Sequence, residues 1–148
     1  MTPIEPIGLI EADIMDVLGF VSSIYLGDRG CKKIVIDGWA RTVCIQVDTI
    51  SRIRSLDGNW HYYNDENLDD GYIVFKDVQG MVLSNNGKIP NDYINYLEVI
   101  QQSEHIYLFT FSANSVEPDG PSSEVILQVT AGGICLVDPN QPEQEITE

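Results

Sequence analysis

Basic residues are scarce in this chain. Lysine and arginine total 8, against 23 aspartates and glutamates, so the formal net charge is −15. All eight bases lie between positions 29 and 88, and the flanking stretches 1–28 and 89–148 contain none. A field of this sign repels nucleic acids and anionic membranes, so we expect neither as a partner. It favours a basic protein partner, although acidity that only maintains solubility would explain the same composition.

Cysteine and long apolar runs are scarce as well. The three cysteines, Cys31, Cys44 and Cys135, form no C-x-x-C pair, which excludes the usual zinc and thioredoxin-like motifs. We expect buried free thiols in a reducing compartment. No apolar stretch approaches the ~20 residues of a membrane span, and the stretch MTPIEPIGLI at the start carries no positive charge. We therefore expect no secretory signal and a cytoplasmic location.

Catalytic motifs are missing too. The two histidines, His61 and His105, belong to no recognised pattern, and the chain has neither G-x-S-x-G nor a phosphate-binding glycine loop. Cys44 paired with a histidine would be a nucleophile, but its expected position in the middle of a strand favours a structural thiol. The sequence therefore predicts no catalytic residue, no metal ion and no cofactor.

The acidic stretch at residues 64–71 invites a calcium interpretation, which its spacing contradicts. An EF-hand that begins at Asp65 needs glycine at its sixth position and glutamate at its twelfth, where this chain has Asp70 and Lys76. A cation site of another type and a glycosidase carboxylate pair in the same stretch are alternatives. Carboxylates this close together in a loop normally stay exposed and ionised, so an acidic loop in solvent is the simpler interpretation.

What the chain does contain is the pattern of a β-rich domain. With 148 residues, 43% of them hydrophobic, it can form a single domain over 1–148 without a disulfide or a metal. Apolar spacing predicts a helix over residues 11–21, and Pro90 followed by Asn91 and Asp92 predicts one helical turn near that point. We therefore expect an α+β fold: a mainly antiparallel curved sheet or small barrel with one N-terminal helix and one short helix.

The clearest local prediction is an antiparallel hairpin formed by Cys31–Asp37 and Val43–Ser51. Alternation of apolar and polar side chains sets its register, because one face of each strand must be buried. The predicted pairs are Ile36–Val43, Val35–Cys44, Ile34–Ile45, Lys33–Gln46 and Lys32–Val47. In that register Cys31 faces Asp48, which disfavours a disulfide between Cys31 and Cys44.

Further strands are expected where β-branched and aromatic residues follow one another. They span residues 22–26, 72–75, 81–83, 97–100, 106–112, 124–130 and 134–137. Turn signals separate several of them, among others at Asn114-Ser115 and at Gly132-Gly133. Residues 138–148 are expected to form a frayed acidic tail.

The strongest candidate site combines aromatic and acidic side chains in adjacent positions. Aromatic rings supply buried area at an interface, and carboxylates select a basic partner. The candidate partner-binding residues are Trp60, Tyr62, Tyr63, Asp65, Glu66, Asp69 and Asp70. The alternative is that aromatic residues of this stretch, such as Trp60 and Tyr62, only fill the core.

The stretch YLGDRGCKKIVIDGW at residues 25–39, followed by ISRIRS, DGYIVF and IPNDYIN, resembles a family of small uncharacterised bacterial domains. This resemblance covers residues 22–100 and implies no particular site residues. The general layout is also similar to that of bacterial immunity proteins, which are short, acidic, β-rich and cytoplasmic and neutralise secreted toxins. The similarity to immunity proteins implies an immunity-like, non-enzymatic protein-binding domain whose partner is a basic toxin.

Two alternatives of other classes remain. One is a small hydrolase or cation-dependent enzyme that uses the acidic loop. The other is a structural homo-oligomer, with a homodimer formed through the charge-neutral middle of the chain at residues 29–88.

Overall fold

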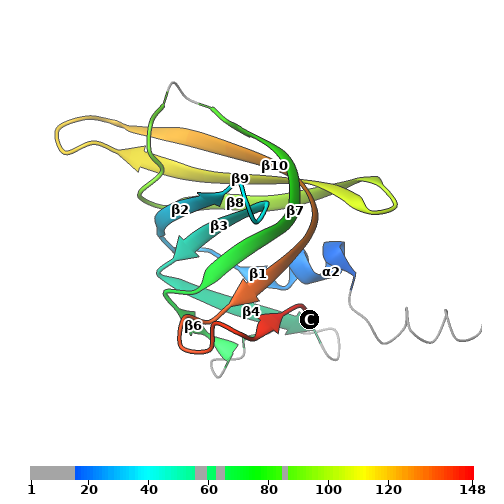
Figure 1. Cartoon of the computed structure of the whole chain (residues 1–148). Helices are drawn as coiled ribbons and strands as arrows, with labels where there is room; N and C mark the ends of the chain where they lie inside the picture. The colour runs from blue at the N-terminus through cyan, green and yellow to red at the C-terminus, as the bar shows by residue number, and fades with distance from the viewer. Residues whose placement is uncertain (1–15, 56–59, 63–65, 85–86) are drawn as a thin grey trace, which may run out of the picture.

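The computed structural model describes residues 16–55, 60–62, 66–84 and 87–148, and these ranges form two antiparallel sheets and one short helix (Figure 1). In chain order the elements are α2 (Val17–Ser22), β1 (Ile24–Tyr25), β2 (Cys31–Asp37), β3 (Thr42–Val47), β4 (Thr49–Ser55), β5 (Trp60–Tyr62), β6 (Leu68–Asp69), β7 (Tyr72–Leu83), β8 (Ile94–Ser103), β9 (Ile106–Val116), β10 (Ser122–Val137) and β11 (Glu145–Ile146). The larger sheet has the order β2-β3-β7-β10-β9-β8, and β11 pairs with β10. The smaller sheet has the order β1-β4-β5, and β6 pairs with β4.

The longest strand, β10, lies inside the larger sheet and pairs with β7 on one side and β9 on the other. Buried residues alternate along it at Val125, Leu127, Val129 and Ala131, as expected for a strand with one face in the core. The β7–β10 register shifts between Thr130 and Ala131, and such a bulge bends a strand pair. Figure 1 shows the two strands curving together through the sheet.

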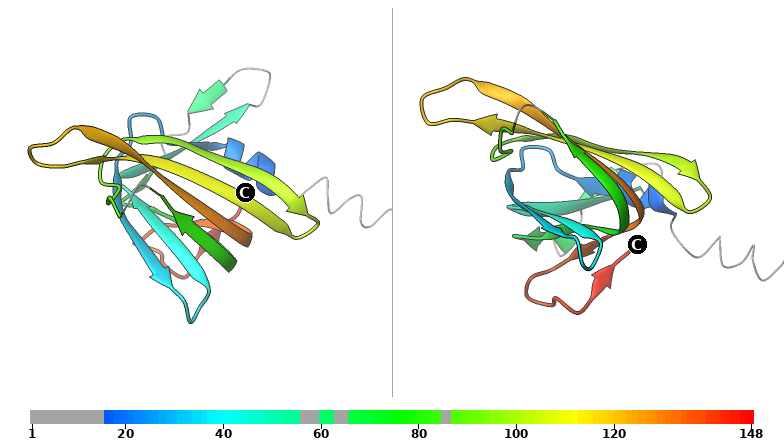
Figure 2. Two further views of the ribbon diagram at one scale, coloured as in Figure 1. Left: turned by 90° about the horizontal axis from the view of Figure 1, so that it is seen from above. Right: turned by 45° about the horizontal axis from the view of Figure 1, so that its top comes forward.

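One continuous cluster of apolar side chains fills the space between the larger sheet, the smaller sheet and α2. Phe75 and Phe109 belong to it, with no exposed surface and with ring centres 4.9 Å apart. The smaller sheet contributes Ile50, and α2 contributes Phe20 and Val21. The views in Figure 2 show α2 and the smaller sheet on the same side of the larger sheet. The curved sheet therefore wraps around its own buried face.

The two outer strands of the larger sheet, β2 and β8, meet at one end only. Gly30 and Tyr93 form an isolated antiparallel bridge, and the Cys31 N–H donates to the Asp92 carbonyl at 2.9 Å. Beyond this corner the strands do not pair within the described ranges. The expected curved antiparallel sheet is confirmed, whereas the small barrel is wrong, because only one corner of the two edges comes within hydrogen-bonding distance.

The expected N-terminal helix is present in its described part as α2, and residues 11–15 lie outside the described residues. Asp16 caps the helix by accepting a hydrogen bond from the Gly19 N–H at 2.8 Å. No helix in the described ranges is long and apolar enough to span a membrane. Within the described ranges the fold is strand-rich, and α2 is the only helix there, so the α part of the expected α+β class is small.

The helical turn expected near Asp92 is wrong. The N–H groups of Asn91 and Asp92 both donate to the carbonyl of Asn114, at 2.9 and 3.0 Å, and β8 begins at Ile94. These hydrogen bonds to a distant strand satisfy the N–H groups that a helical turn would have left free at its start. Tertiary pairing thus overrides a local capping signal.

Two expected turns lie inside long strands. β9 runs through Asn114 and Ser115, and β10 runs through Gly132 and Gly133, so both turn predictions are wrong. A Cβ atom added at Gly132 would lie 3.1 Å from the Cβ of Asp77. Glycine at this position therefore allows the close approach of β7 to β10 beside the bulge and makes no turn.

The expected frayed tail at 138–148 is only partly correct, because β11 pairs with the end of β10. The ammonium nitrogen of Lys76 lies 2.7 Å from a carboxylate oxygen of Glu145 and ties β11 to β7. The hydrogen bond to Glu145 raises the pKa of Lys76.

The predicted hairpin is present as β2 and β3. Its register is as predicted from Lys33–Gln46 to Ile36–Val43. A bulge places Cys31 opposite Val47, so the predicted partners of Lys32 and Cys31 are wrong by one position. All three cysteines are free; Cys31 and Cys135 are buried, and Cys44 is half-buried.

Removal of a core ring tests this packing. We expect Phe109→Ala to lower the free energy of unfolding by roughly 3–5 kcal/mol, because it leaves a cavity against Phe75. The control Ile100→Ala, on the neighbouring strand, removes a side chain that is 63% exposed and should cost no more than about 1 kcal/mol. Urea denaturation of both variants measures the difference, and equal losses would contradict the described core.

Candidate functional site

The hydrogen bonds of β3 determine which edge of β2 is open. The Val47 N–H donates to the Gly71 carbonyl at 2.9 Å, so the peptide groups of Val47 and of alternate β3 residues face β7. Cys44 belongs to the intervening set, whose peptide groups face β2, and it lies opposite Val35. The peptide groups of Val35 therefore face β3.

The two neighbours of Val35 have the opposite orientation. The N–H and C=O groups of Ile34 and Ile36 point away from β3, toward the outer edge of the sheet. Pairing with the β8 end of the sheet stops at Cys31, and no other element in the described ranges pairs with β2 on this side. The stretch from Lys32 to Asp37 is thus an open strand edge.

β7 is longer than the strand beside it. β3 pairs with it only from Tyr72 to Phe75, and the Val78 N–H donates to the Arg41 carbonyl at 2.9 Å just beyond. The rest of β7, up to Leu83, has no strand on this side among the residues described. An opening therefore lies between the β2–β3 hairpin and the far half of β7.

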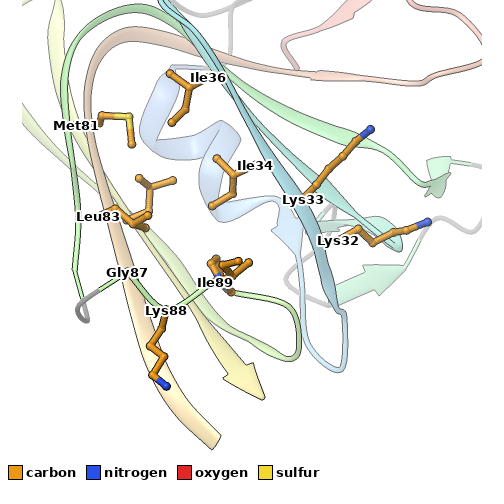
Figure 3. A pocket seen from close by; sticks show the side chains of 11 residues that line it. Lys32, Lys33, Ile34, Ile36, Met81, Leu83, Gly87, Lys88 and Ile89 are labelled. Carbon is orange, nitrogen blue, oxygen red and sulfur yellow. The ribbon is translucent and has the colours of Figure 1, made fainter. Parts of the chain in front are cut away.

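This opening is a groove of about 330 Å³ with a mainly aliphatic lining. Its lining residues are Lys32, Lys33, Ile34, Ile36, Met81, Leu83, Gly87, Lys88, Ile89, Pro90 and Leu127. Figure 3 shows the side chains of Ile34, Ile36, Met81, Leu83 and Ile89 around the opening, from both of its walls. Ile36 is 58% exposed, Leu83 43% and Ile89 71%, so the groove presents apolar surface to solvent.

Three of the eight basic residues stand at the rim of this groove, and their ammonium groups point away from it (Figure 3). Lys32 lies 2.6 Å from Asp70, and this hydrogen bond raises the pKa of Lys32. Lys33 lies 5.8 Å from the ring centre of Tyr72, and Lys88 pairs with Glu117. The rim therefore carries three lysines, two of them paired with acids, while the groove itself remains apolar.

The predicted acidic-aromatic residues are only partly described. Tyr63 and Asp65 lie outside the described residues, and Trp60 and Tyr62 belong to β5, where they lie opposite Ser55 and Ile53 of β4. Asp69 is exposed on β6, where its carboxylate lies 3.5 Å from the hydroxyl of Thr49. Asp70 follows it and pairs with a lysine of β2, at the groove rim.

Glu66 lies elsewhere, in a second cavity of about 420 Å³ that Arg52 also lines. Arg52 is only 2% exposed and donates to the hydroxyl of Ser23 at 2.7 Å. Its guanidinium carbon is 4.9 Å from the ring centre of Phe20, and it also donates to the carbonyl of Glu148 at 3.3 Å. This cavity is therefore built around a buried, partnered arginine that fastens the end of the chain to β4.

The three cysteine thiols do not have the lowered pKa that is typical of a nucleophile. Burial raises the pKa of Cys31 and of Cys135 to about 11, so both are protonated near neutral pH. Burial also raises the pKa of Cys44. Among the described residues, no group of three His, Cys, Asp or Glu side chains could hold a metal ion.

Sequence reasoning missed the groove. It paired the hairpin correctly, but nothing local shows that β2 lies at an edge or that β7 extends past β3. One available signal was the Lys32-Lys33 pair at the start of a strand, since edge strands often carry lysines that discourage unwanted pairing. For the isoleucines that follow, alternation predicts only that they share one buried face of the hairpin.

Comparisons with known proteins add a family match. A model described as a family of unknown function (DUF6258) matches residues 15–148. No curated protein and no solved structure matches the chain. The match agrees with the expected resemblance to uncharacterised domains and supplies no site residues.

The buried thiols predict an alkaline loss of stability. The unfolded chain releases thiol protons near pH 9, whereas folded Cys31 and Cys135 hold theirs until about pH 11. The free energy of unfolding should therefore fall as pH rises through this range, by up to about 2 kcal/mol per thiol. Denaturant titrations compare the wild type with Cys31→Ala/Cys135→Ala, whose fall should be smaller; identical slopes would contradict the assignment.

Proposed function

The chain belongs to this family of unknown function, and we propose that it is a non-enzymatic protein-binding domain that receives an extended partner segment along the open edge of β2. The observation that carries the proposal is the coincidence of unpaired peptide groups with an exposed apolar groove. Neither feature alone would define a site. Together they match the two requirements of recognition by strand addition.

The peptide groups of Ile34 and Ile36 supply the first requirement. An incoming strand that pairs with this edge satisfies N–H and C=O groups that otherwise face solvent, and main-chain hydrogen bonds of this kind provide affinity for many sequences. Such a strand would extend the larger sheet by one position beyond β2.

The groove supplies the second requirement. Side chains of an added strand alternate between the two faces of the sheet, so every second one would point toward the groove. Covering Ile36, Leu83 and Ile89 removes apolar surface from water, and full burial of such a side chain contributes about 1.5–3 kcal/mol. The preferred segment is therefore one with aliphatic residues at alternate positions.

A basic toxin that the chain neutralises is a second form of this proposal. The net charge of −15 and the absence of bases from 89–148 favour a cationic partner and a fast, salt-sensitive association. Its contact residues would include the predicted site residues Glu66, Asp69 and Asp70.

Selection from a displayed library of short random peptides tests the strand-addition site. We expect enriched peptides with alternating aliphatic residues, and Ile36→Pro should weaken their binding by roughly tenfold or more, because proline removes an outward N–H and blocks pairing. Ile36→Ala, which shortens the same side chain but keeps the N–H, should weaken it less. Peptides that bind Ile36→Pro as well as wild type, or no enrichment, would refute the proposal.

Affinity capture from source-cell lysate tests the toxin form. A basic protein retained at low salt and released at higher salt should bind Asp69→Lys more weakly, by roughly two- to fivefold, since an exposed ion pair contributes up to about 1 kcal/mol. Asp119→Lys makes the same charge change in the β9–β10 connection and should leave the affinity nearly unchanged. Equal effects of the two variants would contradict a specific role for the β6 acids.

A further inference from the structure

The open edge of β2 is complementary to itself. Its sequence from Lys32 reads KKIVID, with a base near one end, an acid at the other and three aliphatic residues between them. When two such edges pair in antiparallel orientation around Val35, Ile34 of each copy lies opposite Ile36 of the other. In the same register Lys33 lies opposite Asp37, and the twofold symmetry produces this pair twice.

We propose that the segment that occupies the β2 edge is the β2 strand of a second copy of this chain, so that two larger sheets join into one continuous sheet. This inference rests on the proposed strand-addition function and identifies its partner. The interface is isologous, because each copy contributes the same strand.

The hydrogen-bonding pattern agrees with this register. Ile34 and Ile36 both turn their peptide groups to the open edge, so they form hydrogen-bonded pairs across the interface. Val35 then faces its own counterpart in a non-hydrogen-bonded pair, where opposing side chains approach most closely. Val35 is 42% exposed in the single chain, which leaves it accessible for that contact.

The two neighbouring registers bring no opposite charges together. Pairing centred on Ile34 would place Lys33 opposite Val35, and pairing centred on Ile36 would place Lys33 opposite Trp39. Only the register centred on Val35 sets opposite charges against each other, an arrangement that stabilises antiparallel pairs.

In the single chain, Lys33 and Asp37 are both available to pair with a second copy. Lys32 is already engaged with Asp70, whereas Lys33 makes no ion pair within the described residues. Asp37 is exposed, and one of its carboxylate oxygens accepts the Ala40 N–H at 2.9 Å. Each therefore reaches the interface without first breaking an ion pair.

Two further features fit this arrangement. In this register the fully exposed Trp39, next to the end of β2, lies near the start of β8 in the second copy, where Tyr93 is 57% exposed. The net charge of −15 per chain opposes any dimer, but the acid-rich stretches 1–28 and 89–148 contribute nothing to β2.

Sedimentation equilibrium of the full chain with charge-swapped variants tests the inference. We expect wild type to form dimers as concentration rises. Lys33→Asp and Asp37→Lys should each raise the dimer dissociation constant by roughly tenfold or more, because each sets two like-charge pairs against each other. A mixture of the two single variants should form a heterodimer, and Lys33→Asp/Asp37→Lys should dimerise like wild type. Glu104→Lys, a charge change at an exposed residue between β8 and β9, is the control and should leave dimerisation unchanged.

The outcomes separate this inference from the proposed function. A wild-type chain that stays monomeric up to millimolar concentration, or single variants that dimerise like wild type, would overturn the second copy as occupant. Displayed peptides that still require the Ile36 N–H would then uphold strand addition with another partner. If a charge variant fails to fold by circular dichroism, Ile36→Pro replaces it, and a dimer that persists in that variant would equally overturn the inference.

Discussion

The difference in length between β7 and β3 is the constraint on which the rest of this molecule depends. β3 covers only the first part of β7, from Tyr72 to Phe75, while β10 pairs with β7 as far as Leu83. The far half of β7 therefore follows β10 and separates from the β2–β3 hairpin. The groove, its exposed isoleucines and the open edge of β2 all follow from that divergence. A β3 strand long enough to match β7 would have filled the opening.

Several of the few basic residues have a structural role. Arg52 lies buried on Phe20 and binds the hydroxyl of Ser23, and Lys76 holds β11 against β7. Lys32 and Lys88 direct their charges outward to acids at the groove rim. Lys32, Lys76 and Lys88 each pair with a carboxylate, whereas Lys33 lies over the ring of Tyr72. The composition therefore determines local pairing as well as the long-range field.

Local patterns predicted the structure where neighbours in sequence are also neighbours in space. The β2–β3 register followed from alternation, since one face of the hairpin is buried, and it failed only at the bulge beside Lys32. Asn91 and Asp92 carry a helix-cap signal, yet hydrogen bonds to Asn114 make them the approach to β8. Gly132-Gly133 suggested a turn because glycine permits many conformations, while the structure uses it for close strand packing beside a bulge. Whether a strand lies at an edge depends on its non-neighbours, so the groove was beyond local reasoning, and the acidic-aromatic site remains a prediction.

The position of β10 within the sheet has a consequence for biosynthesis. The chain emerges from the ribosome with β2, β3 and β7 first, and the strand that joins them to β8 and β9 comes almost last. Until β10 is synthesised, one edge of β7 and one edge of β9 have no partner, and sheets with such distant pairings form slowly. The edge of β7 that β10 covers thus has no partner from the synthesis of Leu83 until that of β10. Slow elongation through Ser122–Val137 would therefore prolong the exposure of those edges, and a chaperone that covers them would reduce it.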